Sequence, residues 1–261
     1  MPAIIILGIV SIHPFSALIG LAALIGLALL VTAPAWRAHP RLHRIDAGLG
    51  ALAGGVIGAR AGHVLLNMAY FADHAAEVFN LRAGGLNWHG ALVGGLLGFA
   101  LVARWRCMSV LAVSDRLAVI WSVGLLFGWA ACGATTCGFG REVWTLADYP
   151  AWMVHEAPDV YGMIAPRYNA PLFGMALGGL VLVVTLSLAR KGWLGGARLW
   201  LAVVVTGAGM FTIGFVRGDG QPGPLPNLTR DQVLDLGVVA LGIVGLVEAW
   251  LYRRRSERIR A

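Results

Sequence analysis

The sequence predicts an all-α integral membrane protein, built as a bundle of seven transmembrane helices. Hydrophobic residues make up 58% of its 261 residues, charged residues only 13%, and the mean hydropathy is +0.75. A soluble domain carries roughly 25% charged residues, about twice as many. The apolar residues form runs of the ~20 residues that a helix needs to span a bilayer. They lack the alternation of polar and apolar residues that marks a membrane β-barrel.

Seven apolar segments fit this length, and we expect a single transmembrane domain over residues 1–261. The segments are 15–33, 47–71, 87–104, 112–133, 170–189, 198–216 and 233–252. Residues 1–14 are expected to form a short surface helix or an extension of the first span. The 36 glycines indicate helices whose backbones approach closely, because small residues line helix contacts in lipid.

The basic residues predict the orientation. Most of the 20 lie in the loops 34–46, 104–116 and 190–198 and in the tail after residue 252. Basic loops stay in the cytoplasm, so we expect the N-terminus outside and the C-terminus inside. The formal charge of +7 then faces the anionic inner leaflet, and it does not indicate a nucleic-acid partner.

The longest predicted connection, 134–169, falls on the outer side. It contains three tyrosines, two tryptophans and three prolines. Aromatic residues gather where membrane meets water, so we expect interfacial structure here, either a lid or short helices.

Arg60 is the most informative charge because it falls inside a predicted span. A buried cation is costly in a membrane, which favours a functional role, and a guanidinium matches phosphate oxygens with two hydrogen bonds. The alternative is an arginine that reaches the outer interface or pairs with an acid. His63 and Asn67 follow on the same helical face as Arg60. This polar stripe lines a cavity or joins neighbouring helices.

Four arginines are expected to gather on the outer side and to hold an anionic lipid headgroup. With Arg60, these are Arg82, which begins a glycine-rich stretch, Arg141, which follows Gly140 in a glycine-flanked turn, and Arg217, which ends the sixth span. Glycine-flanked backbone forms concave anion sites. For Arg217, an ion pair with Asp219 is the alternative.

His89 lies in the stretch RAGGLNWHGALVGGLLG, residues 82–98, where Gly90 follows it. An imidazole is a common general base in enzymes, so His89 is a candidate base. The alternative is a histidine bonded to a backbone carbonyl. Cys132 and Cys137 are five residues apart, with no histidine nearby, so no metal site is predicted. We interpret them as structural thiols, with a thiol nucleophile or a redox pair as alternatives.

These motifs resemble the phosphatidylglycerol:prolipoprotein diacylglyceryl transferases. The stretch GGVIGARAGHVLLN is similar to the family's glycine–arginine span, and RAGGLNWHGALVGGLLG is similar to its R-x-G-G-x-S-F-H-G-G box. Weaker similarity runs through CGFGREVW (137–144) and TGAGMFTIGFVRGDGQ (206–221). In the latter, Met210 and Gly214 replace an arginine and a glutamate of the family.

The resemblance implies a seven-span enzyme of the bacterial inner membrane without a cofactor. It would move a diacylglyceryl group from phosphatidylglycerol, or another anionic phospholipid, to a cysteine of a prolipoprotein signal peptide. His89 would be the catalytic histidine. By resemblance, Arg60 and Arg217 would contact the lipid phosphate. We expect the headgroup site to include also Arg82, Arg141, His63, Asn67, Gly90 and Gly140. A non-catalytic lipid-binding relative is the alternative, because several polar motif residues are replaced.

Overall fold

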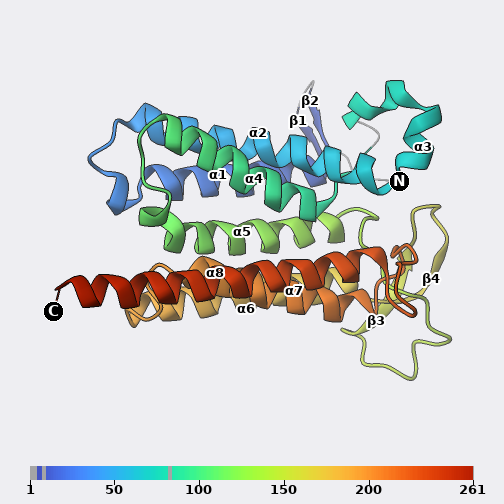
Figure 1. Ribbon diagram of the computed structural model, residues 1–261. Coiled ribbons are helices and arrows are strands. Elements are labelled where there is room, and N and C mark those ends of the chain that lie inside the picture. Colours follow the sequence, from blue (N-terminus) through green and yellow to red (C-terminus); the bar gives the residue numbers. More distant parts are fainter. Residues whose placement is uncertain (1–4, 8–9, 82–83, 261) are drawn as a thin grey trace. The chain divides into compact units, whose positions relative to one another are not determined.

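The computed structural model describes residues 5–7, 10–81 and 84–260, and it is mostly helical (Figure 1). A helix overlaps each of the seven predicted segments. The helices are α1 (Pro14–Val31), α2 (Arg41–Leu66), α3 (Met68–Asp73), α4 (Trp88–Trp105), α5 (Ser114–Gly133), α6 (Ala170–Arg190), α7 (Arg198–Gly214) and α8 (Arg230–Arg260). The strands are β1 (Ile5–Leu7), β2 (Val10–Ile12), β3 (Val154–Pro158) and β4 (Ile164–Tyr168).

Among the described residues, five helices are long and apolar enough to cross a membrane. They are Pro14–Val31, Arg41–Leu66, Leu111–Gly133, Ala170–Arg190 and Arg230–Arg254, and Arg198–Gly214 is a shorter apolar helix. Their outer faces expose large apolar side chains such as Leu24 and Val183. Helices with such faces satisfy their own backbone and suit a lipid solvent. The prediction of a helical membrane protein is therefore confirmed, while the number of spans and the orientation stay predictions.

The described chain forms two compact units, which are treated separately below. One unit is Leu27–Val113, and the other combines the segment up to Gly26 with the chain from Ser114 onward.

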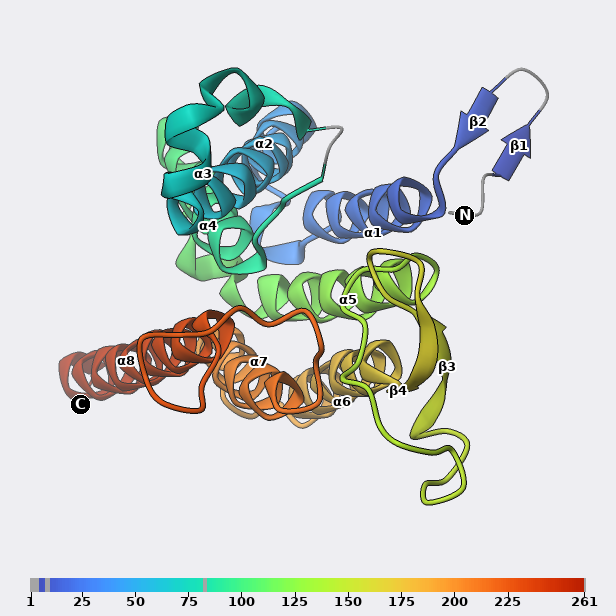
Figure 2. The ribbon, with the colours of Figure 1, turned by 90° about the vertical axis from the view of Figure 1, so that its right-hand side faces the viewer.

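In the Leu27–Val113 unit, α2 packs on α4 through facing glycines (Figure 2). A Cβ atom on Gly54 would lie 2.3 Å from the carbonyl oxygen of Gly94, and one on Gly90 would lie 2.2 Å from that of Gly58. No larger residue fits at such distances. The glycine content therefore reflects close helix packing, as the sequence predicted.

The boundaries of the second predicted span, 47–71, were wrong at both ends. α2 begins at Arg41 and ends at Leu66, and α3 follows after a break. At the break, Asn67 has φ −125° and ψ 34°, and its Nδ2 donates to the His63 carbonyl over 2.8 Å. An asparagine that bonds locally to the backbone competes with helix continuation, which explains the interruption.

In the other unit, α5 packs on α6, and α7 packs on α8. Gly174 of α6 faces the Trp129 ring of α5, and the indole of Trp121 donates to Thr206 of α7 over 3.0 Å. Thr229 and Gln232 form a reciprocal cap at the start of α8: the Gln232 side chain accepts from the Thr229 N–H, and Thr229 Oγ1 accepts from the Gln232 N–H.

Strands form in two segments where helices were expected. Ile5–Leu7 and Val10–Ile12 pair antiparallel, so the helical prediction for 1–14 was wrong where these residues are described; their β-branched side chains favour strands. In the outer segment 134–169, β3 and β4 form a hairpin, so the short helices expected there were wrong. Asp159 shapes the hairpin turn, since its Oδ1 accepts from the N–H groups of Tyr161 and Met163.

Candidate functional site

Arg60 is buried on α2 and donates hydrogen bonds to four backbone carbonyls. Its Nε donates to Val78 over 2.8 Å, and its Nη1 donates to Gly84 over 2.8 Å and to Gly85 over 3.2 Å. Its Nη2 donates to the Glu77 carbonyl. Among the described residues no carboxylate forms an ion pair with Arg60. The guanidinium therefore holds the backbone at residues 77–78 and 84–85, and the carbonyl groups that it contacts carry no negative charge.

Gly85 explains why glycines precede His89 in the sequence. Its φ of +71° lies in the left-handed region, and a Cβ there would lie 2.5 Å from His63 Nε2 and 2.9 Å from Arg60 Nη1. Asn67 Nδ2 lies 3.4 Å from His63 Nδ1. The predicted stripe of Arg60, His63 and Asn67 is therefore one connected set beside the 84–85 backbone.

His89 lies in the first turn of α4, buried, with its ring 4.0 Å from the Trp88 ring. Asn87 caps this turn by accepting from the Gly90 N–H, and its own N–H donates to the Ala59 carbonyl over 2.9 Å. Ala59 is the neighbour of Arg60 in the chain. His89 and Arg60 thus lie at the same end of the α2–α4 pair. Arg82 lies outside the described residues.

In the other unit, Arg217 lies just beyond α7 between two carboxylates. It forms two hydrogen bonds with Asp219, of 2.8 and 2.9 Å, and its Nη1 lies 3.4 Å from Asp231 Oδ2. Burial acts to lower the pKa of the Arg217 guanidinium, but the hydrogen bond to Asp219 and the charges of Asp219, Asp231 and Asp235 raise it above its ordinary value. Arg217 therefore stays protonated and is neutralised by its own chain.

Gly140 and Arg141 belong to an extended strap, residues 139–141, that is held on two sides. The Arg141 N–H donates to the Val216 carbonyl over 2.7 Å, and the Arg141 carbonyl accepts from the Tyr168 N–H over 3.1 Å. A Cβ on Gly140 would lie 1.9 Å from the Tyr168 carbonyl oxygen, so only glycine fits. The backbone thus holds Arg141 firmly while its side chain stays exposed.

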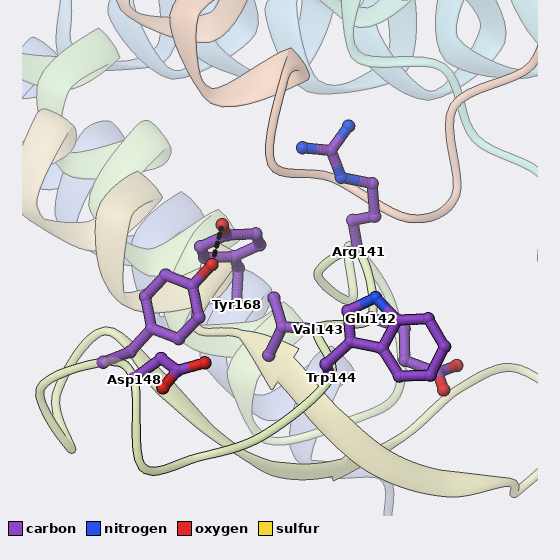
Figure 3. Close-up of a pocket in the computed structure, with 7 residues that line it drawn as sticks. Arg141, Glu142, Val143, Trp144, Asp148 and Tyr168 are labelled. Carbon is purple, nitrogen blue, oxygen red and sulfur yellow. Dashed lines mark hydrogen bonds between the residues drawn. The ribbon is translucent and has the colours of Figure 1, made fainter.

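A pocket of about 220 Å³ opens beside this strap (Figure 3). Its lining residues are Arg141, Glu142, Val143, Trp144, Asp148, Tyr149 and Tyr168. The Arg141 guanidinium points away from the carboxylates of Glu142 and Asp148, and it has no ion pair among the described residues. It can therefore offer two parallel hydrogen bonds to a phosphate.

Two tyrosine hydroxyls form the polar wall of this pocket. Tyr168 donates to Tyr149 over 3.3 Å, and this hydrogen bond is the main reason that the pKa of Tyr149 is raised. The Tyr149 hydroxyl therefore stays neutral at physiological pH and is able to donate to an anion. Sequence reasoning singled out Arg141 but missed these tyrosines, because only the hairpin brings Tyr168 beside Tyr149.

Cys132 and Cys137 are joined by a disulfide at the end of α5, so the interpretation as thiols was wrong. Neither sulfur is a thiol nucleophile in this structure. The five-residue spacing spans a single turn beyond the helix, where the two sulfurs meet. Cys107 is a free, exposed cysteine.

The fold is that of a multi-pass helical membrane protein, and the candidate site residues are arginines, tyrosines and a histidine near helix ends. A family model described as prolipoprotein diacylglyceryl transferase matches residues 2–248. The chain therefore belongs to the prolipoprotein diacylglyceryl transferase family, and it is a membrane transferase of that type.

Relatives support this assignment across the chain. A phosphatidylglycerol–prolipoprotein diacylglyceryl transferase of Rhodospirillum rubrum is 34% identical over 206 residues, which cover 75% of this chain and 72% of the relative. One from Methylocella silvestris is 33% identical over 228 residues, covering 84% and 80%. One from Erwinia tasmaniensis is 27% identical over 292 residues, covering 99% and 95%.

Proposed function

We propose that this protein transfers a diacylglyceryl group from phosphatidylglycerol to the cysteine thiol of a prolipoprotein signal peptide. The relatives' names indicate these two substrates. The observation that supports a phosphate-bearing donor best is Arg141, an exposed guanidinium with no acidic partner among the described residues, beside two tyrosine hydroxyls. This set suits an anionic headgroup, because it combines a positive charge with the free O–H donor of Tyr149.

In the proposed reaction, the acceptor thiolate attacks the glyceryl carbon that bears the phosphate ester. A carbon–sulfur bond forms, the carbon–oxygen bond breaks, and glycerol phosphate leaves with the electron pair. His89 takes the thiol proton, since an imidazole is a base near neutral pH. Arginines stabilise the negative charge that develops on the departing phosphate. This electrostatic stabilisation is strongest where water is excluded.

The residues proposed for headgroup binding divide by their surroundings. Arg141, with Gly140, contacts the phosphate directly. Arg60, with His63, Asn67 and Gly90, supplies positive charge and shape at the end of the α2–α4 pair. Arg217 is proposed as a further headgroup contact. Its backbone pairs with Gly140 of the strap, and its side chain is held by Asp219 and Asp231. Arg82 is proposed as a further phosphate contact on the strength of its motif position.

We further infer seven spans in the bacterial inner membrane, with the N-terminus outside and the C-terminus in the cytoplasm. The basic loops support this orientation. The Cys132–Cys137 disulfide supports it independently, since disulfides persist in oxidising compartments such as the periplasm. The candidate headgroup pocket then faces the outer leaflet.

The test is transfer to a lipobox peptide in vesicles containing phosphatidylglycerol, with mass spectrometry of the product, alongside rescue of a transferase-depleted strain. The wild type is expected to form a thioether-linked diacylglyceryl peptide. Replacing Arg141 with glutamine should lower the rate by about 100-fold, as for other lost charge-stabilising donors. Arg190→Gln, at the far end of α6, is the matched control and should retain the rate. Co-purified phospholipid without any thioether product would instead favour the non-catalytic lipid-binding alternative.

A further inference from the structure

The loop between the Arg141 strap and β3 presents apolar side chains to its surroundings. We call residues 144–152 the overhang loop. Trp144 is fully exposed, at 101%, and Trp152 is 60% exposed, with Leu146 between them also exposed. Two exposed tryptophans on one short loop are unusual in water, because an indole ring carries a large apolar surface.

The overhang loop lies beside the end of a membrane-crossing helix. Asn169 accepts from the Leu172 N–H at the start of α6, and its own N–H donates to the Met153 carbonyl over 2.8 Å. The Trp152 ring meets the Phe173 ring of α6 edge to face, with centroids 6.2 Å apart. Trp152 therefore packs on the first turn of α6, a helix that is long and apolar enough to cross a membrane.

The loop also extends in the direction that lipid would occupy. The β3–β4 hairpin runs across the ends of the helices in its unit, crosswise to their axes (Figures 1 and 2). Figure 2, which views these helices from their ends, shows the loop before β3 reaching outside the area that they cover. The helix that Trp152 contacts, α6, also exposes Leu180 and Val183 further along its length.

We propose that the overhang loop rests in the interfacial layer of the outer leaflet, with the Trp144 and Trp152 rings at the boundary between headgroups and acyl chains. Tryptophan is enriched at this boundary because its ring is apolar and its N–H is polar. The occupant of the surface is lipid, since Trp152 packs on the first turn of α6, a helix long and apolar enough to cross a membrane. The same loop supplies Asp148 and Tyr149 to the pocket. If the proposed function holds, the loop therefore keeps the pocket at the height of the phosphates.

The interfacial position of the overhang loop is tested by measuring how deep a fluorescent probe on the loop lies in the membrane. This measurement does not require catalytic turnover. In a Cys107→Ser background, Trp144→Cys is labelled without reductant with an environment-sensitive fluorophore, so that the Cys132–Cys137 disulfide stays closed. The matched control is Glu156→Cys, an exposed charged position on β3 of the same hairpin. Both proteins are placed in vesicles of phosphatidylcholine and phosphatidylglycerol, and quenching by nitroxide lipids is compared with quenching by aqueous iodide.

The probe at position 144 is expected to be quenched several-fold more by nitroxide lipids than by iodide, and the probe at 156 should show the reverse. A labelled Trp152→Cys protein repeats the test if Trp144→Cys folds poorly. Equal quenching at 144 and 156 would overturn the proposal. So would shielding from iodide that appears only when a lipobox peptide is added, since the surface would then bind protein. If nitroxide lipids quench the probe at position 144 but the wild-type protein shows no transfer activity, the interfacial position of the loop is supported and only the proposed function is contradicted.

Discussion

The arginines proposed to bind phosphate differ in what surrounds each guanidinium. Arg60 donates to neutral carbonyls, Arg217 is neutralised by two aspartates, and Arg141 is exposed with no acidic partner in the described part of the chain. The sequence indicated four outer-side arginines with the same expected role, of which Arg82 lies outside the described residues. Their surroundings depend on residues far along the chain, such as Tyr168, so only the folded structure separates their roles.

At the residue scale, Gly174→Ala should destabilise the α5–α6 contact. A Cβ there would lie 2.0 Å from the Trp129 ring, so the ring must move, and such overpacking costs about 1–3 kcal/mol. Gly179, five residues further along α6, has open space where a Cβ would lie, with no atom within 4 Å, and Gly179→Ala is the matched control. Thermal unfolding in detergent should show a lower midpoint for Gly174→Ala alone. Equal midpoints would refute the packing argument.

Arg217→Gln should lower stability more than the loss of an exposed ion pair does. It would leave Asp219 and Asp231 without a counter-charge beside the buried Asp235, whereas an exposed ion pair is worth about 1 kcal/mol or less. Chemical unfolding in detergent measures the change. The control is Arg106→Gln, because the Arg106 side chain is 31% exposed and the Arg217 side chain only 15%. A loss of stability no larger than that of Arg106→Gln would show that the ion pairs of Arg217 contribute little to stability.

At the scale of elements, apolar runs predicted the helices well, while their interruptions were missed. The break at Asn67 depends on one side chain that bonds to the backbone, and the outer hairpin depends on pairing between segments that are distant in sequence. Periodicity and hydropathy register neither effect. The same limit applies to the disulfide, because the spacing of two cysteines does not reveal the turn that joins them.

The disulfide predicts a cysteine-labelling pattern and a change in stability. Alkylation without reductant should modify Cys107 alone, and all three cysteines should react after reduction and unfolding. Replacing Cys132 and Cys137 with serine should cost about 2 kcal/mol, as expected for a short closed loop. Thermal unfolding checks this, with Cys107→Ser as the control. Three reactive thiols before reduction would contradict the structure.

The α2–α4 contact predicts a position-specific effect of small side chains. Gly94→Ala should separate these helices, because its Cβ would lie 2.2 Å from the Gly54 carbonyl oxygen. Gly20→Ala, on α1, has no neighbour within 4 Å and is the control. A disulfide cross-link between cysteines introduced at Gly55 and Gly95 should form readily in the control and poorly in Gly94→Ala. Similar cross-linking in both would count against close packing.

At the scale of the whole molecule, charge and the disulfide predict the same orientation. In a Cys107→Ser background, a cysteine at Asp148 should react with a membrane-impermeant maleimide on intact spheroplasts. A cysteine at Lys191, in the basic turn after α6, should react only after permeabilisation. Both positions are exposed. Labelling of Lys191→Cys from outside would reverse the proposed orientation.

Composition and short motifs were enough to establish a helical membrane protein, the location of its main helices and the family that it resembles. Those properties depend on local sequence patterns, which can be read within one segment without knowing its tertiary contacts. Folding was needed to show that Arg141, unlike Arg60 and Arg217, offers its guanidinium to solvent, that Tyr149 and Tyr168 share its pocket, and that Cys132 is bonded to Cys137. These features arise from contacts between side chains and backbone that meet only when the chain folds, so no local pattern contains them.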